Sequence, residues 1–206
     1  MPSYTCKVCG TAFEVAPAAL AKYPSWKPQY CREHSPNKTR RGGAKREEHL
    51  TLEQVLARYT GGPQNGVFTD GSSIPNPGPG GWGVVWVEDG EIRAQRHGHE
   101  PATTNNRMEL TALIEAYRLL PEQAVATVQT DSRLCVDTIT KWAAGWERRG
   151  WKRKGGEIKN LELIRELYAL HGSHPHCALE WIAAHSGHRW NEYADSLATA
   201  WARDVL

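Results

Sequence analysis

Short apolar runs and amphipathic segments alternate along residues 65–206 of this 206-residue chain. Apolar residues at every second position, or in a short unbroken run, are typical of strands, whereas spacings of three and four are typical of helices. The pattern predicts strands at 67–69, 82–88, 91–97, 124–130 and 179–184, and helices at 105–120, 132–142, 161–170 and 191–202. This order predicts an α/β fold with a mixed five-stranded sheet flanked by helices.

Turn and capping residues set the limits of several elements. Asp89-Gly90, between two apolar segments, is a strong hairpin signal. Thr103-Thr104-Asn105 supplies side chains that cap a helix N-terminus, and Pro121 closes the same helix. Upstream, a short helix is expected at 51–59, with Gly61-Gly62-Pro63 as a sharp stop.

Composition divides the chain into three parts. Residues 1–36 contain three cysteines and a histidine, residues 37–64 hold a polar basic linker and the short helix, and residues 65–206 carry the α/β pattern. The net charge is only +2, but residues 141–159 hold seven Lys or Arg against two Glu. Such a local basic patch suits a polyanionic partner, although a solvated loop would have the same composition.

Signals of export or of a membrane anchor are lacking. No apolar stretch reaches the ~20 residues that cross a bilayer, and the first residues lack the order of a signal peptide. Five cysteines, an odd number, argue against a secreted disulfide framework. We therefore expect a cytoplasmic protein without membrane contact, and a monomer because no feature indicates an obligate oligomer.

Four acidic residues stand at the edges of apolar segments: Asp70, Glu109, Asp131 and Asp195. Asp70 and Asp131 each follow a Thr at the end of a predicted strand, so parallel neighbouring strands would bring both to one edge of the sheet. Glu109 and Asp195 each lie beside the apolar stripe of a helix. Singly, each acid is more simply a cap or a surface group. Together, four buried carboxylates need cations, and divalent metals indicate phosphodiester chemistry.

Seven segments between residues 68 and 195 follow one order and spacing. They are Phe-Thr-Asp-Gly-Ser (68–72), Asn-Pro-Gly-Pro-Gly-Gly-Trp-Gly (76–83), Thr-Thr-Asn-Asn-Arg-Met-Glu-Leu (103–110), Thr-Asp-Ser (130–132), Trp-Glu-Arg-Arg-Gly-Trp (146–151), His-Ser-Gly-His (185–188) and Asn-Glu-Tyr-Ala-Asp (191–195). From residue 68 onward the chain closely resembles bacterial type 1 ribonuclease H. Integrases and resolvases of the same broad fold lack the Asn- and Gly-rich segments.

The resemblance implies hydrolysis of the RNA strand of an RNA–DNA hybrid with two Mg²⁺ (or Mn²⁺) ions, giving 5′-phosphate and 3′-hydroxyl ends. It implies that Asp70 bridges the ions, that Asp195 helps to hold the ion that activates water, and that Glu109 and Asp131 hold the ion on the leaving-group side. His185 matches the family's mobile histidine, which aids proton transfer or product departure. Removal of RNA primers in DNA replication is an implied role.

The resemblance also implies which residues contact the hybrid. Asn76, Asn105 and Asn106 would lie in the minor groove, and Thr104 would bind a DNA-strand phosphate at a helix N-terminus, although these residues could equally be simple caps. The basic stretch 141–159 resembles the family's basic protrusion, where some Trp residues are expected in the core and at least one at the DNA groove. The further contacts expected are Arg133, Trp142, Trp146, Arg148, Arg149, Trp151, Lys152 and Asn191.

Arg133 departs from the family pattern, because many bacterial relatives carry Gln after the Asp-Ser pair. The Arg side chain is longer and charged, so it can reach a phosphate instead of a base edge.

Cys6-Lys-Val-Cys9 and Cys31-Arg-Glu-His34 form two ligand pairs separated by 21 residues. This Cys₃His set fits a tetrahedral zinc site, and the stretch between the pairs is too short for a metal-free core. The alternative is a set of free thiols in a disordered tail. We expect one Zn²⁺ in a zinc-ribbon-like module at 1–36, with a nucleic-acid or protein partner. The other two cysteines, Cys135 and Cys177, are expected to be small buried residues.

Two other functions remain open at this point. A catalytically spent adaptor that binds hybrid or double-stranded RNA would normally have lost a carboxylate, and all four are present. A resolvase-like enzyme acting on DNA would lack the Asn-rich segments. Both features favour the ribonuclease.

Overall fold

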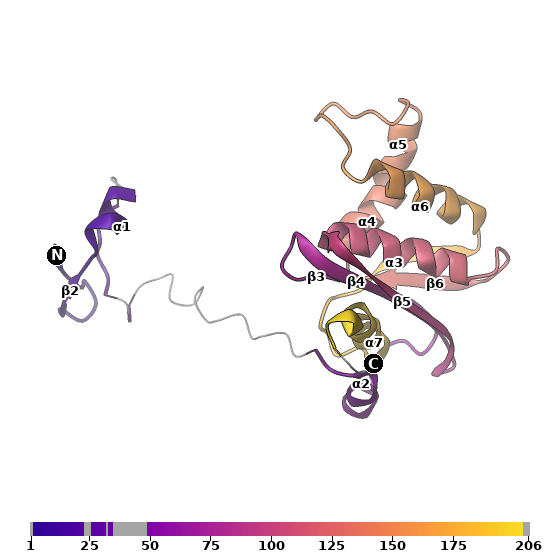
Figure 1. Ribbon diagram of the computed structural model, residues 1–206, viewed down its shortest axis with the longest axis horizontal. Helices are drawn as coiled ribbons and strands as arrows, with labels where there is room; N and C mark the ends of the chain where they lie inside the picture. Colours follow the sequence, from indigo (N-terminus) through magenta and orange to yellow (C-terminus); the bar gives the residue numbers. More distant parts are fainter. Residues whose placement is uncertain (1, 23–25, 32, 35–48, 204–206) are drawn as a thin grey trace. The chain divides into compact units, whose positions relative to one another are not determined.

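The structure is a computed structural model, and it describes residues 2–22, 26–31, 33–34 and 49–203. The chain divides into two compact units, residues 1–48 and 49–206 (Figure 1). Residues 37–48, most of the expected basic linker, lie outside the described residues. Each unit is considered separately.

The larger unit is built on a five-stranded sheet with the strand order β5-β4-β3-β6-β7 (Figure 1). The strands are β3 (Gly66–Ser73), β4 (Gly78–Glu88), β5 (Glu91–Thr103), β6 (Ala126–Thr130) and β7 (Cys177–Trp181). The first three form an antiparallel meander, whereas β6 pairs parallel to β3, and β7 parallel to β6. The predicted mixed sheet is thus confirmed.

The predicted hairpin is present, but several strand ends differ from the prediction. Asp89 and Gly90 both have positive φ, 52° and 77°, as the tight turn requires. β5 continues to Thr103 because its antiparallel pairing with β4 extends as far as Gly78. The predicted strand at 179–184 is wrong at both ends: β7 pairs with β6 from Cys177 to Trp181 and then loses its partner strand.

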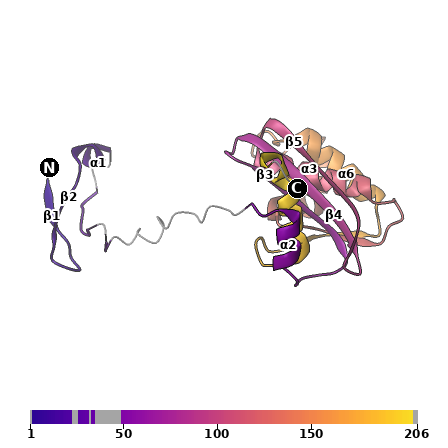
Figure 2. The same ribbon diagram turned by 60° about the horizontal axis from the view of Figure 1, so that its bottom comes forward.

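Helices cover both faces of the sheet, as Figures 1 and 2 show. On one side lie α3 (Asn105–Leu119), α4 (Arg133–Asp137), α5 (Ala143–Glu147) and α6 (Leu161–Ser173), and on the other lie α7 (Arg189–Ala198) and α2 (Leu52–Arg58). A π-helical turn η2 (Thr138–Trp142) joins α4 to α5, so the helix predicted at 132–142 continues further. The 3₁₀ turn η3 (Ala200–Ala202) follows α7, where a continuous helix was predicted.

Two apolar cores fill the space between the sheet and its helices. Val67 and Val84 belong to the core beneath α3 and α6, whereas their chain neighbours Phe68 and Val85 belong to the core beneath α7 and α2. This division follows from the alternation of side chains along a strand. Because both faces are covered, β3 and β4 each carry consecutive buried apolar residues, Val67-Phe68 and Val84-Val85.

The short helix predicted at 51–59 is found as α2 and packs on α7. Thr51 and Gln54 form a reciprocal capping box, with N···O distances of 3.3 and 2.9 Å. Val55 is fully buried in the second core, and the Ser196 hydroxyl of α7 donates to the Leu50 carbonyl at 2.6 Å. Composition had grouped this helix with the linker, but its apolar face makes it part of the larger unit.

The smaller unit contains the antiparallel hairpin β1 (Ser3–Thr5) and β2 (Ala12–Glu14), followed by α1 (Pro17–Lys22). The hairpin turn closes with hydrogen bonds from Gly10 N to the Cys6 carbonyl at 2.9 Å and from Cys6 N to the Thr11 carbonyl at 3.0 Å.

Within the described residues, no helix combines the length and apolar character that a membrane crossing requires.

Candidate active site and metal sites

The parallel pairing of β3 with β6 brings two of the predicted carboxylates to one edge of the sheet. Thr69 pairs with Thr130, so Asp70 and Asp131 follow at the same level. Asp70 still belongs to β3 and faces Gly83 of β4, whereas Asp131 lies just beyond β6. The predicted parallel adjacency of the two strands is confirmed, but the predicted strand end at Asp70 is wrong, because β3 stays paired with β4 as far as Ser73.

Glu109 reaches this edge because α3 lies unusually close to β3. A Cβ atom added to Gly71 would lie 2.1 Å from the Glu109 backbone nitrogen, so only glycine permits this approach. Thr104 caps the helix, its hydroxyl accepting from Arg107 N at 3.4 Å. Carboxylate oxygens of Asp70, Glu109 and Asp131 all lie within 4.8 Å of one another.

Asp195 approaches the cluster from the opposite face, on α7. A Cβ atom added to Gly83 would lie 2.4 Å from the Ala194 carbonyl oxygen, so this glycine lets α7 lie against β4. The Asp195 carboxyl group is a hydrogen-bond neighbour of Asp70. Two glycines on adjacent strands thus bring a helix to each face of the sheet, a relation that the sequence reasoning missed.

The carboxylates strongly perturb one another. Burial, followed by the charges of Glu109, Asp195 and Asp131, raises the pKa of Asp70 well above its usual range. Burial and the charge of Asp131 likewise raise the pKa of Glu109. Burial raises the pKa of Asp131, with His185 acting in the opposite direction.

The residues of this cluster fit divalent cations. Oε2 of Glu109 is buried and has no hydrogen-bond partner within the described part of the chain. A buried, unsatisfied carboxylate oxygen beside other carboxylates is a group that a hard cation would satisfy.

His185 lies in the exposed loop between β7 and α7, in a left-handed conformation with φ of 48°. Its Nδ1 is 3.9 Å from Oε2 of Glu192, which is buried in the first turn of α7. Oε1 of Glu192 accepts a hydrogen bond from Gly187 N at 3.3 Å. Glu192 therefore braces the histidine loop. It had not been singled out in the sequence, although it stands in the Asn-Glu-Tyr-Ala-Asp segment.

Residues 63–203 match the family model described as RNase H. The chain belongs to the ribonuclease H family. Among curated relatives, the ribonuclease H of Methylorubrum extorquens (strain PA1) is 43% identical over 141 residues, which are 68% of this chain and 60% of that protein. This chain therefore spans less than two thirds of that relative. The ribonuclease H of Alkalilimnicola ehrlichii is 48% identical over 132 residues, 64% of this chain and 89% of the relative.

A solved structure agrees with this family assignment. The crystal structure of LC9-RNase H1, described as a type 1 RNase H with the type 2 active-site motif, superimposes with a TM-score of 0.55 and 38% identity. The match covers 68% of this chain and 74% of that one. The first 62 residues, which contain the Cys/His segment, lie outside the ribonuclease H match.

Of the three asparagines expected to contact the minor groove, Asn76 and Asn105 link β3 and its following loop to α3, whereas Asn106 links α3 to Asn160. Oδ1 of Asn105 accepts from Ser73 N at 2.7 Å, and Oδ1 of Asn76 accepts from Asn105 N at 3.3 Å. Oδ1 of Asn106 accepts from the Asn160 side chain at 2.8 Å. Asn76 and Asn105 remain exposed, so each fixes the loop while presenting part of its amide to solvent.

The basic stretch 141–159 carries its tryptophans in different environments. The Trp142 side chain is 41% exposed, and its ring lies 6.0 Å from that of Trp146, which is half-buried against the first core. Trp151 packs edge-on against Tyr168 at 5.9 Å. The cations expected at the hybrid, Arg148, Arg149 and Lys152, are all exposed.

Two other expected contacts lie near the carboxylates. Asn191 is buried in the first turn of α7, and its Oδ1 has no hydrogen-bond partner among the described residues. Arg133 is exposed at the start of α4.

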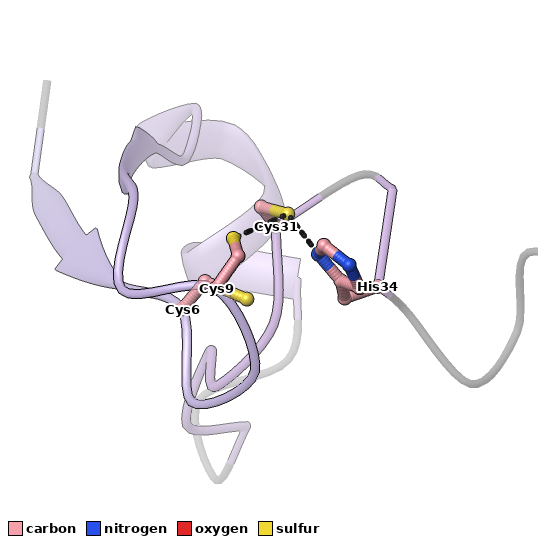
Figure 3. A group of neighbouring side chains, drawn as sticks. All are labelled: Cys6, Cys9, Cys31 and His34. Atoms are coloured by element: carbon pink, nitrogen blue, oxygen red, sulfur yellow. Dashed lines mark hydrogen bonds between the residues drawn. The ribbon is translucent and has the colours of Figure 1, made fainter.

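In the smaller unit, the four predicted zinc ligands come together from two turns (Figure 3). Ligand atoms of Cys6, Cys9, Cys31 and His34 lie within 4.8 Å of one another. The Cys9 and Cys31 sulfurs are 3.8 Å apart, and Cys31 Sγ is 3.2 Å from His34 Nδ1. This converging Cys₃His set fits a tetrahedral metal site.

The Cys6 thiol of this group has a lowered pKa, which favours its thiolate form. Burial alone would raise the pKa of Cys6, but hydrogen bonds from the backbone of Cys31, Cys9 and Val8 lower it to about 6. A thiolate is the form of cysteine that binds metal. Elsewhere, Cys135 and Cys177 are buried, as predicted.

Proposed function

We propose that the larger unit hydrolyses the RNA strand of RNA–DNA hybrids by two-metal-ion catalysis and leaves 5′-phosphate and 3′-hydroxyl ends. The observation that carries this proposal is the convergence of four carboxylates at one sheet edge in a member of the ribonuclease H family. A catalytically spent adaptor would have no need to maintain a cluster in which neighbouring acids raise the pKa of Asp70 and Glu109.

Asp70, Glu109, Asp131 and Asp195 would hold two Mg²⁺ or Mn²⁺ ions, and we assign Asp70 to both ions. Asp195 would help to hold the ion that activates the attacking water, and Glu109 and Asp131 would hold the ion that stabilises the leaving oxygen. Bound ions supply the positive charge that an in-line displacement at phosphorus requires. The chain itself contributes the placement of these acids, because Asp70 lies within β3 and the close approach of α3 at Gly71 holds Glu109 beside it.

We assign His185 to proton exchange at the edge of the carboxylate cluster. Its loop position lets the ring approach the reacting phosphate, and Glu192 limits how far the loop can swing. Such a residue assists proton transfer to the leaving oxygen or departure of the product.

Strand selection is assigned to separate groups. Asn76, Asn105 and Asn106 contact the minor groove, where the 2′-hydroxyl distinguishes RNA from DNA. Thr104 holds a DNA-strand phosphate at the N-terminus of α3. The exposed Trp142 and the neighbouring Arg and Lys residues bind the DNA strand by stacking and by charge. Primer removal in the cytoplasm is the setting in which we place this activity.

The test is cleavage of an end-labelled RNA–DNA hybrid in Mg²⁺ by the parent protein and by Asp70→Asn. Asp70→Asn preserves side-chain volume and removes the bridging charge, so we expect loss of cleavage with retained hybrid binding. Double-stranded DNA serves as the substrate control. No cleavage by the parent, equal cleavage by both proteins, or cleavage of the DNA control would contradict the proposal.

The smaller unit has a role of its own in this proposal. Cys6, Cys9, Cys31 and His34 hold one Zn²⁺, and the zinc module at residues 1–36 binds nucleic acid. Exposed Trp26 and Tyr30 side chains, 48% and 38% accessible, lie near exposed lysines in the sequence, a combination that suits stacking on bases. Tethering of this module through the basic linker raises the local concentration of hybrid at the active site of a monomer.

Metal analysis and truncation test the role of the module. We expect about one zinc per chain in the purified protein and loss of this zinc in Cys31→Ser. Removal of residues 1–48 should weaken hybrid binding and processivity while leaving the turnover of saturating short hybrid unchanged. Unchanged affinity and processivity would exclude nucleic acid as the partner and point to a protein.

A further inference from the structure

Trp181 and Arg133 form a stacked pair at the rim of the carboxylate site. The guanidinium carbon of Arg133 lies 4.4 Å from the centre of the Trp181 ring, within the range of a cation–π contact. Both residues are exposed, and 42% of Trp181 is accessible. The exposed Trp181 ring thus holds the positively charged Arg133 side chain beside a cluster of four acids.

The pair is anchored to the backbone of a carboxylate residue. Trp181 is the last residue of β7 and pairs with Thr130, the residue before Asp131. Its Nε1–H donates to the Asp131 carbonyl oxygen at 2.9 Å, and Arg133 N donates to the same oxygen at 3.1 Å. These bonds fix the indole plane and the start of α4 relative to Asp131.

Apart from its contact with the Trp181 ring, the Arg133 guanidinium has no ion-pair partner among the described residues. Stacking restricts the guanidinium group but leaves its N–H donors available, because they lie in the plane of the guanidinium and not above its face. A restricted cation loses less conformational entropy when it binds an anion.

We infer that Arg133 and Trp181 form a subsite for a backbone phosphate of the cleaved strand, next to the phosphate that reacts. This inference rests on the proposed function, because it requires the reacting phosphate to lie at the carboxylates. Trp181 Nε1 and Arg133 N both donate to the Asp131 carbonyl, so the pair lies beside the carboxylates at which the reacting phosphate would bind. Arg133 supplies paired N–H donors, and Trp181 holds them in one orientation.

Binding measurements can test the subsite without cleavage. In an Asp70→Asn background, the Kd of a short labelled RNA–DNA hybrid is measured over a series of KCl concentrations. We expect Arg133→Gln to weaken binding by about fivefold to 20-fold at low salt and to reduce the slope of log Kd against log salt by about one, because one phosphate contact is lost.

Further variants separate the two parts of the pair. Arg133→Lys retains the charge but not the planar stack, so the salt slope should be kept while affinity falls by about threefold. Trp181→Leu should likewise keep the salt slope and lower affinity by about threefold, because it removes the ring on which Arg133 stacks. The matched control is Arg93→Gln, an exposed arginine paired with Glu88 beside the β4–β5 turn, at the opposite end of β3 from Asp70. This control should change neither Kd nor slope.

In the cleavage-competent protein, Arg133→Gln should raise KM with little change in kcat, because the contact is made to bound substrate throughout. An unchanged salt slope in Arg133→Gln, with melting temperatures equal to the parent, would overturn the subsite. Absence of hybrid cleavage by the parent would instead reject the proposed function, and the binding series would still report on the subsite.

Discussion

Substitution of Gly71 by alanine tests whether helix α3 is placed by contact with β3. The added methyl group would lie 2.1 Å from the Glu109 nitrogen and 2.3 Å from the Met108 carbonyl carbon. Ordinary contact begins at 3.4 Å. Both obstructing atoms are backbone, so no side-chain rotation can relieve the clash.

The loss of stability in Gly71→Ala follows from the difference between these short distances and an ordinary contact. The start of α3 must retreat by about 1.3 Å, and overpacking of this kind costs about 1–3 kcal/mol. For a domain of this size the melting temperature should fall by about 3–10 °C. Glu109 moves with the helix, and a displacement near 1 Å in an active site can cost about 10²-fold in rate.

Thermal unfolding and hybrid cleavage at 25 °C measure the two effects separately. We expect Gly71→Ala to remain folded at that temperature, to lose most of its kcat, and to need more Mg²⁺ for half-maximal rate. Gly172→Ala is the matched control. Gly172 lies within α6, where an added methyl group meets nothing within 4 Å, so helix propensity should make the substitution neutral or slightly stabilising. A Gly71→Ala protein with parental melting temperature and kcat would refute the reasoning.

Three other outcomes are expected. Because the pKa of Asp70 is raised in the folded state, the metal-free fold holds its proton more tightly than the unfolded chain does, so stability should decline as pH rises from about 4 toward the raised folded value. In EDTA, urea unfolding should find Asp70→Asn more stable than the parent at pH 8 and equal to it near pH 4, whereas lower stability at pH 8 would contradict this electrostatic account. Removal of residues 1–48 should leave the melting temperature of the larger unit unchanged. Removal of residues 1–60 should lower this melting temperature, since burial of Val55 alone contributes about 1.5–3 kcal/mol. Equal melting temperatures for the two truncations would mean that α2 does not stabilise the fold. Glu192→Gln should lower kcat more than affinity by loosening the histidine loop, and a parental pH–rate profile and kcat would remove Glu192 as a positioning residue.

Much of the fold could be predicted from local pattern because the relevant forces act between near neighbours. The Asp89-Gly90 turn, the Thr104 cap and the α2 capping box each involve residues within four positions of one another. Strand ends were less accurate, because a strand ends where its partner ends. The C-terminal limit of β7 is set by Thr130, a residue far away in the sequence.

The candidate site was accessible from sequence to the extent that short motifs carry it. Matching Thr-Asp strand ends predicted that Asp70 and Asp131 would be neighbours, and parallel pairing of β3 with β6 bears this out. The roles of Glu192 and Trp181 could not be predicted, because each depends on a distant partner. Glu192 contacts the histidine loop, and Trp181 donates to the Asp131 carbonyl. A single side chain in one strand or helix gives no sign of such a partner.

The sequence by itself determined the alternation of strands and helices, the family, and the identity of the candidate metal ligands, because these depend on residue type and short spacing. Only the tertiary structure decided how four acids from two strands and two helices meet. That meeting depends on Gly71 and Gly83, which let α3 and α7 approach opposite faces of the sheet closely enough to bring Glu109 and Asp195 to Asp70. The physical reason is steric: backbone atoms can pack at this distance only where both strands lack a Cβ.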